Sequence, residues 1–191
     1  MRDKLLHSTS GSVYHVVNHS IDGRDLYYNP GDYKNYLHFF KEALTVDVIV
    51  LAYCLMPNHF HFLLQQNTPE AISDLFEATN KRYARYYNKE HGFKGRVFRA
   101  QLQYRETMDD RYLLNTSAYI HANPVQAKLI DLPEQWEYSN FREYMRLRSG
   151  TLFSVQFLQN YIGNPEAYRL RVIELAHKKS MQRAFERDKL K

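Results

Sequence analysis

Two histidines separated by one residue are the first candidates for chemistry. His59 and His61 lie in a segment, residues 59–65, whose side chains alternate as a β-strand requires. Residues i and i+2 of a strand share a face, so both imidazoles would project together while Phe60 points into the core. Two imidazoles on one rigid strand can share a divalent cation. A pair of surface histidines would give the same pattern, so a third ligand and a nucleophile are needed to decide.

Tyr119 and Asn123 can supply both of these groups. They are four residues apart in a segment predicted to be helical, which places them on one helix face. Asn123 offers a carbonyl oxygen to a metal ion, and Tyr119 offers a phenol. A phenol is a weak nucleophile at neutral pH unless a nearby cation or base favours the phenolate, and a metal ion would also polarise a phosphate. The alternative is that Tyr119 packs as a helix aromatic and Asn123 caps the helix before Pro124.

An alternating series of strands and helices must position these residues. The turn signal Pro57-Asn58 predicts a tight hairpin between two central strands, and Asp109 and Asp110 can cap the helix that carries Tyr119. The order β-α-β-β-α-β-α predicts an α+β fold with helices packed on a largely antiparallel sheet. Strands are expected at residues 12–18, 46–55, 59–65 and 97–104, and helices at 33–44, from Thr68-Pro69 to about 88 with Pro69 in the first turn, at about 111–123 ended by Pro124, and at about 166–189.

Positive charge is concentrated in two segments of a chain whose net charge is +5. Residues 81–105 contain eight Lys or Arg and one acidic residue, interleaved with aromatic residues, as expected of a surface that neutralises a phosphate backbone and stacks on bases. A solvated basic helix face is the plainer alternative. From residue 141 onward the chain contains eleven basic residues and five acidic ones. The phosphate contacts that we predict are Arg82, Arg85, Lys89, Arg96 and Arg99.

Other features of the chain narrow its class. The single cysteine, Cys54, cannot form an internal disulfide and is expected in the core. The first residues lack the apolar run of a signal peptide, and the longest apolar segment, residues 48–56, is only strand-sized. We therefore expect a cytoplasmic protein with no membrane partner. Its organisation is expected to be a catalytic domain of residues 1–145 followed by a basic, largely helical extension of residues 146–191.

The motifs around the two candidate sites resemble one known family. MPNHFHFLL at 56–64, followed by AYIHANPVQAKLI at 118–130, is similar to the REP-associated tyrosine transposases, a branch of the single-tyrosine HUH transposases of the IS200-like group. The likeness continues through VYHVVNHSIDGR, RVFRAQLQYRET and WEYSNFREY. It covers residues 12–144, about two-thirds of the chain.

This resemblance implies a fold, a site and a substrate. The fold would be ferredoxin-like, with an antiparallel sheet and helices on one side. His59 and His61 would hold Mg²⁺ or Mn²⁺, with Asn123 as third ligand where other relatives use glutamine. Tyr119 would attack a DNA phosphate to give a 5′-phosphotyrosine link and a free 3′ hydroxyl. The substrate would be single-stranded or hairpin-forming DNA, bound by a monomer or a homodimer.

The chain also departs from the family pattern. Relatives usually read close to YIHLNPVRAGLV, whereas Ala122, Gln126 and Lys128 stand here in place of Leu, Arg and Gly. Gln126 removes a forked guanidinium that the charge of Lys128 does not replace. The positions of the metal ligands and the nucleophile are intact.

Three functions are consistent with this pattern. The first is an active DNA strand transferase, the second a catalytically silent, domesticated DNA-binding protein of the same fold, and the third a phosphodiesterase that uses water in place of tyrosine. Of the remaining histidines, His121 should point away from Tyr119 on a helix and is expected to pack or to hydrogen-bond. His15 and His19 lie on or just after the first strand, within possible reach of the site.

Overall fold

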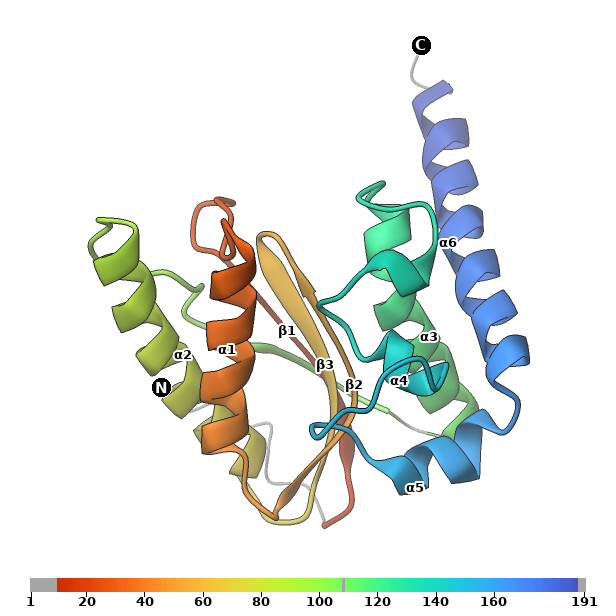
Figure 1. Cartoon of the computed structure of the whole chain (residues 1–191), viewed down its shortest axis with the longest axis horizontal. Coiled ribbons are helices and arrows are strands. Elements are labelled where there is room, and N and C mark those ends of the chain that lie inside the picture. Colours follow the sequence, from red (N-terminus) through yellow and green to blue (C-terminus); the bar gives the residue numbers. More distant parts are fainter. Residues whose placement is uncertain (1–9, 108, 189–191) are drawn as a thin grey trace. The chain divides into compact units, whose positions relative to one another are not determined.

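The computed structural model describes residues 10–107 and 109–188, with side chains described in these ranges except at 155, 158–159 and 179–188 (Figure 1). The chain divides into two compact units. The first comprises residues 1–51 and 55–107, and the second comprises residues 52–54 and 108–191. The predicted division into a catalytic domain of residues 1–145 and an extension of residues 146–191 concerns function and stays a prediction.

The first unit is built on a four-stranded sheet with the order β2-β3-β1-β4. Its strands are β1 (Val13–His19), β2 (Val48–Met56), β3 (His59–Gln66) and β4 (Gln103–Glu106). β1 pairs antiparallel with both β3 and β4, and the two residues Pro57 and Asn58 join β2 to β3. With α1 (Pro30–Ala43) after β1 and α2 (Ala71–Glu90) after β3, the order is β-α-β-β-α-β. The predicted ferredoxin-like α+β fold is confirmed.

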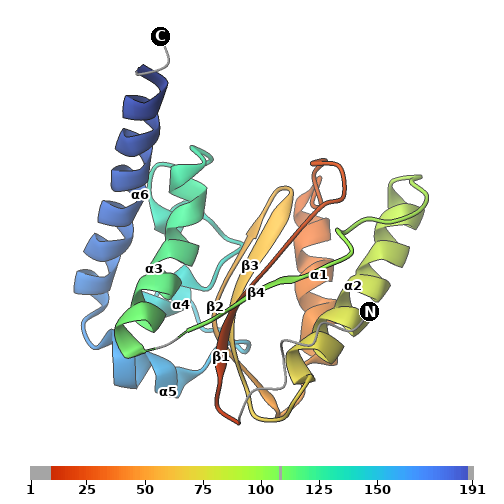
Figure 2. The same cartoon turned by 180° about the vertical axis from the view of Figure 1, so that it is seen from behind.

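α1 and α2 cover one face of this sheet (Figures 1 and 2). Alternate residues of β3 point toward them: the ring of Phe60 contacts Tyr36 of α1 and stacks on Phe76 of α2, and Phe62 stacks on Phe40 of α1. The rings of all five residues are fully buried. The aromatic residues that the sequence offers in such number therefore form a core, and that core fixes which face of β3 is turned away from the helices.

The start of α1 is tied to the end of α2 by one buried carboxylate. Asn29 caps α1 and Pro30 is its first residue, so the helix begins three residues before the expected start. The Asp32 carboxylate is fully buried and accepts hydrogen bonds from the backbone N–H groups of Tyr28 and Asn29 and from the Tyr86 hydroxyl. The ring of His91, at the end of α2, lies 3.1 Å from the same carboxylate. A charge buried this deeply is tolerated because each oxygen has hydrogen-bond partners.

Three of the expected elements differ from those observed. The predicted strand at 97–104 is interrupted: Phe98 forms an isolated bridge with Ser20, and regular pairing resumes only in β4. α2 begins at Ala71, after a left-handed Glu70, so Pro69 precedes the helix instead of lying in its first turn. The third helix, α3 (Asp110–Gln126), continues through Pro124, which was expected to end it. Asp109 caps it as expected, by accepting from the Tyr112 N–H.

The second unit packs short elements around α3. They are η2 (Pro133–Gln135), α4 (Phe141–Tyr144), α5 (Val155–Phe157), the π-helical turn η3 (Leu158–Ile162) and α6 (Pro165–Asp188). Tyr168 and Val172 of α6 are buried, so the part of the chain predicted to be a basic extension contributes to the core of this unit. Three residues of β2 belong to it as well. The Tyr53 N–H donates to the Asn140 side-chain oxygen, the Asn140 N–H donates to the Tyr53 carbonyl, and Cys54 forms an isolated β-bridge with Ser139. Cys54 is fully buried, as expected of a core residue.

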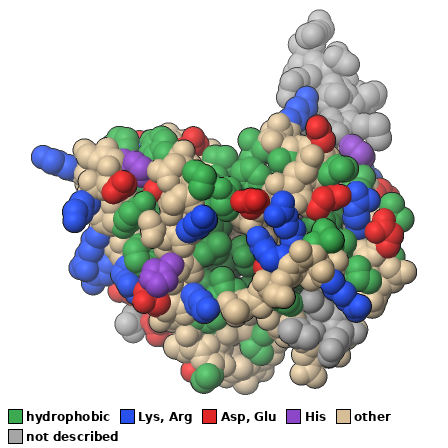
Figure 3. All heavy atoms as spheres, in the orientation of Figure 1, with side chains coloured by type: hydrophobic (Ala, Val, Ile, Leu, Met, Phe, Trp, Pro, Cys, Tyr) green, Lys and Arg blue, Asp and Glu red, His purple; other side chains and the backbone are tan. Residues whose placement is uncertain are grey.

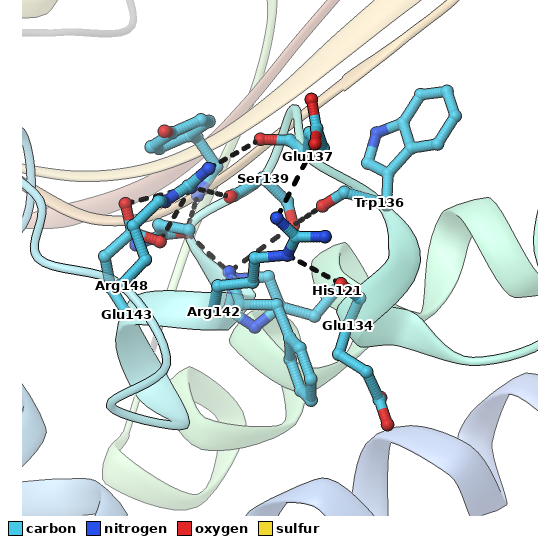
Figure 4. Close-up of polar contacts among 11 residues, drawn as sticks. His121, Glu134, Trp136, Glu137, Ser139, Arg142, Glu143 and Arg148 are labelled. Carbon is cyan, nitrogen blue, oxygen red and sulfur yellow. Dashed lines mark hydrogen bonds and ion pairs between the residues drawn. The ribbon is translucent and has the colours of Figure 1, made fainter.

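Polar contacts fix the loop that follows α3 (Figure 4). The guanidinium of Arg148 donates to the backbone oxygens of Glu137 and Ser139 and to the carboxylate of buried Glu143, 2.8 Å away. His121, which is buried, lies between Asn140 Oδ1 at 2.9 Å and the Tyr168 hydroxyl at 2.8 Å. Because burial lowers the pKa of His121 to about 4, the ring is neutral at pH 7. It donates from Nε2 to Asn140 and accepts from Tyr168, which confirms a hydrogen-bonding role for His121.

α3 ends at a residue in the left-handed conformation. Lys128 has φ 59°, its N–H donates to the carbonyl of Val125, and the N–H of Leu129 donates to the carbonyl of Pro124. This is the Schellman ending, whose left-handed position glycine occupies most easily. The departure from the family pattern at residue 128 is thus a departure in backbone preference as well as in charge.

Lys128→Gly is expected to stabilise the protein. Relief of the left-handed strain gains roughly 1–2 kcal/mol, and the lost positive charge at the helix end costs about 0.3–1 kcal/mol. The net gain in the free energy of unfolding should be about 1 kcal/mol, measured by urea denaturation. Ala127→Gly is the matched control, because Ala127 is right-handed and should lose stability. An unchanged or lower stability for Lys128→Gly would contradict this account of the helix ending.

Candidate functional site

The paired histidines lie on the face of the sheet that is turned away from α1 and α2. Phe60 and Phe62 point toward those helices, so His59 and His61 point to the opposite side. Strand pairing then selects their neighbours on β1: His19 lies opposite His59, and Val17 lies opposite His61. Directly paired residues share a face, so the odd-numbered residues of both strands gather on this side.

Four imidazoles are neighbours on this face. The ring of His59 is 4.9 Å from that of His61 and 4.9 Å from that of His19, on which it stacks. The ring of His15 stacks on that of His61 at 5.2 Å, and His15 Nε2 is 3.0 Å from His61 Nδ1. The structure therefore brings both histidines of the first strand to the paired motif. Their approach depends on the strand register, which the sequence pattern did not specify.

The environment favours the neutral form of three of these rings, those of His15, His19 and His59. Burial lowers the pKa of His59 to about 4, with a smaller effect of nearby His19. Burial, followed by the charge of Arg105, lowers the pKa of His15 to about 4. The pKa of His19 is lowered by burial and by the charge of Arg99. Neutral imidazole is the form that binds metal ions, so the electrostatics of this face suit a cation site at neutral pH.

The hydrogen bonds at His59 identify which nitrogen is available. Its Nδ1 lies 2.7 Å from the side-chain oxygen of Asn58, which can only accept, so Nδ1 carries the hydrogen. The lone pair is then on Nε2. His61 likewise has its Nδ1 engaged, by His15. A pair of imidazoles held through Nδ1 is the usual arrangement of metal-binding histidines, so this pair fits a divalent cation.

Tyr119 and Asn123 lie on α3, in the second unit. Tyr119 is half-buried and Asn123 is 8% exposed. The Asn123 amide nitrogen donates to the carbonyl of Tyr119 at 2.8 Å and to that of Ile120 at 3.4 Å. Pro124 lacks the N–H that would normally bond the Ile120 carbonyl, so the Asn123 side chain replaces it. This explains how α3 continues past the proline. It also excludes the alternative of Asn123 as the helix cap, since Ala127 occupies that position.

The same contact orients the Asn123 side chain. Because its nitrogen faces the helix backbone, the amide oxygen is the group left to accept or to bind a cation. In the part of the chain that the structure describes, no group of three or more His, Cys, Asp and Glu side chains could hold a metal ion. The predicted ligand set of His59, His61 and Asn123 stays a prediction.

The predicted phosphate contacts differ in their surroundings. Arg82 is paired with Glu42 at 2.7 Å and covers the ring of Phe39, so its charge is partly neutralised within the protein. The other four, Arg85, Lys89, Arg96 and Arg99, are exposed. Figure 3 shows Lys and Arg side chains gathered over the part of the first unit where α1 and α2 lie.

Two cations flank the histidine face. Arg99 lies close enough to lower the pKa of His19, and Arg105 of β4 pairs opposite His15 and lowers its pKa. Arg105 was not among the predicted contacts. Arg105 could be found only from the register of β4 against β1, which local sequence pattern does not specify.

Gln126, the second departure from the family pattern, faces the protein. It is 9% exposed, and its amide nitrogen donates to the carbonyl of Leu175 on α6 at 3.3 Å. In this chain the position therefore belongs to the packing of α3 against α6.

Comparison with solved structures places the fold. The structure matches that of a REP-associated tyrosine transposase solved bound to a REP hairpin, with a TM-score of 0.64 and 14% sequence identity, over 81% of this chain and 94% of that one. A search of curated proteins found no match. In the described part of the chain, no helix has the length and apolar character needed to cross a membrane.

Comparison with protein families places the sequence. The family described as IS200-like transposases matches residues 8–123, which include the paired histidines, Tyr119 and Asn123. The chain belongs to this family of transposases. The resemblance that the sequence motifs indicated is confirmed.

Asn123→Ala should lower the free energy of unfolding by about 1–2 kcal/mol, because it removes the donor that replaces the missing N–H of Pro124. In a Pro124→Ala background, where the backbone N–H is restored, the same substitution should cost less. Urea unfolding of the wild type, both single variants and the double variant gives the coupling. Equal costs of Asn123→Ala in both backgrounds would refute the compensating role.

Proposed function

We propose that this protein is a metal-dependent transposase that nicks and transfers single-stranded or hairpin-forming DNA through Tyr119. The observation that carries the proposal is the pair of imidazoles of His59 and His61, which share one sheet face and are each engaged through Nδ1. Membership of the IS200-like family supports it, because transposition requires DNA cleavage. The hairpin bound to the structurally similar transposase supports hairpin DNA as the substrate.

In the proposed reaction, Tyr119 is the nucleophile. Its phenolic oxygen loses its proton and bonds to the phosphorus of a DNA phosphodiester, while the bond from phosphorus to the 3′ oxygen breaks. The 3′ oxygen takes up a proton and leaves as a free hydroxyl, and the 5′ phosphate remains on Tyr119. Attack on this phosphotyrosine by a 3′ hydroxyl reverses the exchange and joins a new strand, which makes the step a transfer with no net hydrolysis.

His59, His61 and Asn123 would hold the divalent cation, Mg²⁺ or Mn²⁺. When bound, such an ion supplies positive charge that polarises the phosphate and favours the phenolate. The role of the protein is to keep His59 neutral by burial and to hold the Asn123 amide with its oxygen directed away from the helix backbone.

The exposed cations of the first unit would hold the DNA backbone. Arg85 and Lys89 lie on α2, and Arg96 and Arg99 lie on the segment between α2 and β4. Arg99 and Arg105 flank the histidine face, where they would attract the phosphate next to the scissile bond. We extend the proposal to a cytoplasmic protein, monomeric or homodimeric, with the basic charge of residues 146–191 as a second DNA-binding surface.

Tyr119→Phe should abolish covalent attachment to DNA while leaving DNA affinity unchanged, because only the attacking oxygen is removed. The measurement is a denaturing gel of the full-length protein incubated with labelled hairpin DNA and Mg²⁺ or Mn²⁺. Tyr112→Phe, a half-buried tyrosine on the same helix, is the matched control and should still form the adduct. Cleavage that persists in Tyr119→Phe would indicate hydrolysis by water, and binding without cleavage by the wild type would indicate a silent DNA-binding protein.

Arg85→Ala should weaken the binding of hairpin DNA at low salt and reduce the slope of log affinity against log salt by about 1, as expected for one lost phosphate contact. Fluorescence anisotropy over a salt series measures both quantities. Arg24→Ala is the control, because Arg24 belongs to the first unit as well and is already paired with Asp22. An unchanged salt slope for Arg85→Ala would remove Arg85 from the DNA-binding surface.

A further inference from the structure

We propose that Asn58 and His15 are positioning residues for the metal site: each accepts a hydrogen bond from Nδ1 of one of the paired histidines and so directs the lone pair of that imidazole to Nε2. Asn58 would orient His59, and His15 would orient His61. The inference rests on the proposed function, because it concerns the same cation site. It adds two residues that bind neither metal nor DNA and that decide whether both ligands are in the competent form.

The role of Asn58 follows from how its amide group is fixed. The side-chain nitrogen is 3.4 Å from the carbonyl of Gly23, to which it donates. The side-chain oxygen is therefore the atom turned toward His59, 2.7 Å from Nδ1. The backbone is held too, because Ser20 donates its N–H to the Asn58 carbonyl at 2.9 Å. An acceptor fixed in this way permits only the form of His59 that carries hydrogen on Nδ1.

The role of His15 follows from the single hydrogen atom that lies between His15 and His61. His15 Nε2 and His61 Nδ1 are 3.0 Å apart, so one nitrogen must donate to the other. If His15 donates, neutral His61 carries its hydrogen on Nε2 and has no lone pair there for a cation. If His61 donates, its lone pair is on Nε2. Cation binding at His61 Nε2 therefore requires His15 to be the acceptor, with its own hydrogen on Nδ1.

His19 provides a contrast within the same cluster. It stacks on His59 with ring centroids 4.9 Å apart and the planes inclined by 19°. A stacked ring packs against its neighbour but does not select which nitrogen carries the hydrogen. His19 is therefore a matched control: it is the same residue type on the same strand and face, in contact with a ligand by packing.

The experiment measures Mn²⁺ binding to the full-length protein without DNA, by calorimetry and by the electron paramagnetic resonance signal of free Mn²⁺. His15→Phe and Asn58→Leu are each expected to weaken binding about 10–100-fold, the usual effect of removing such a partner. His15→Gln and Asn58→Asp, which keep an acceptor, should recover most of the affinity. His19→Phe should bind Mn²⁺ nearly as the wild type does.

The outcomes separate this inference from the proposed function. Wild-type affinity in His15→Phe and Asn58→Leu, together with lost binding in His61→Ala, would overturn the positioning role and leave the metal site standing. Unchanged binding in His61→Ala would overturn the metal site and this inference with it. If a variant does not fold, the nitrogen-15 signals of the imidazoles in the metal-free wild type give the answer. Hydrogen on Nδ1 of His59 and His61 supports the inference, and hydrogen on Nε2 of either overturns it.

Discussion

The candidate site depends first on the register of β3 against β1. Because side chains alternate, a slip by one residue would turn Phe60, Phe62 and Leu64 out of the core and His59 and His61 into it. These three side chains would then lose their packing against α1 and α2, which forms the core of the first unit. The aromatic packing against α1 and α2 therefore sets the chemistry of the opposite face, although none of those rings touches it.

The pairing of the strands also brings other side chains next to the two histidines of β3. Pairing brings His19 against His59 and His15 within 3.0 Å of His61, and it sets Arg105 beside His15. In the second unit, buried polar groups support α3, the helix that carries Tyr119 and Asn123. His121 is held between Asn140 and Tyr168, and the Asn123 amide substitutes for the N–H that Pro124 lacks. The histidine face of the first unit and α3 of the second are each supported by side chains that are not themselves reactive.

Local pattern was enough to predict much of this protein. The alternation around His59 and His61 predicted their shared face, and the Asp109 cap and the turn at Pro57 and Asn58 were visible in the sequence. What local pattern missed depended on partners distant in sequence. His15 and His61 are 46 residues apart, and their contact follows from pairing. Pro124 was expected to end α3 because the rule for proline takes no account of a neighbouring side chain that can replace the lost donor.

The β2–β3 turn is held by contacts that also reach the paired histidines. Hairpin tips are ordinarily the places where a chain accepts inserted residues and evolves in length. Here the carbonyl of Pro57 accepts from Leu26 and Tyr27, and Asn58 links the loop at Gly23 to the His59 ring. An inserted peptide at this tip would separate the strand from the loop that braces it, so the turn is closed to such variation.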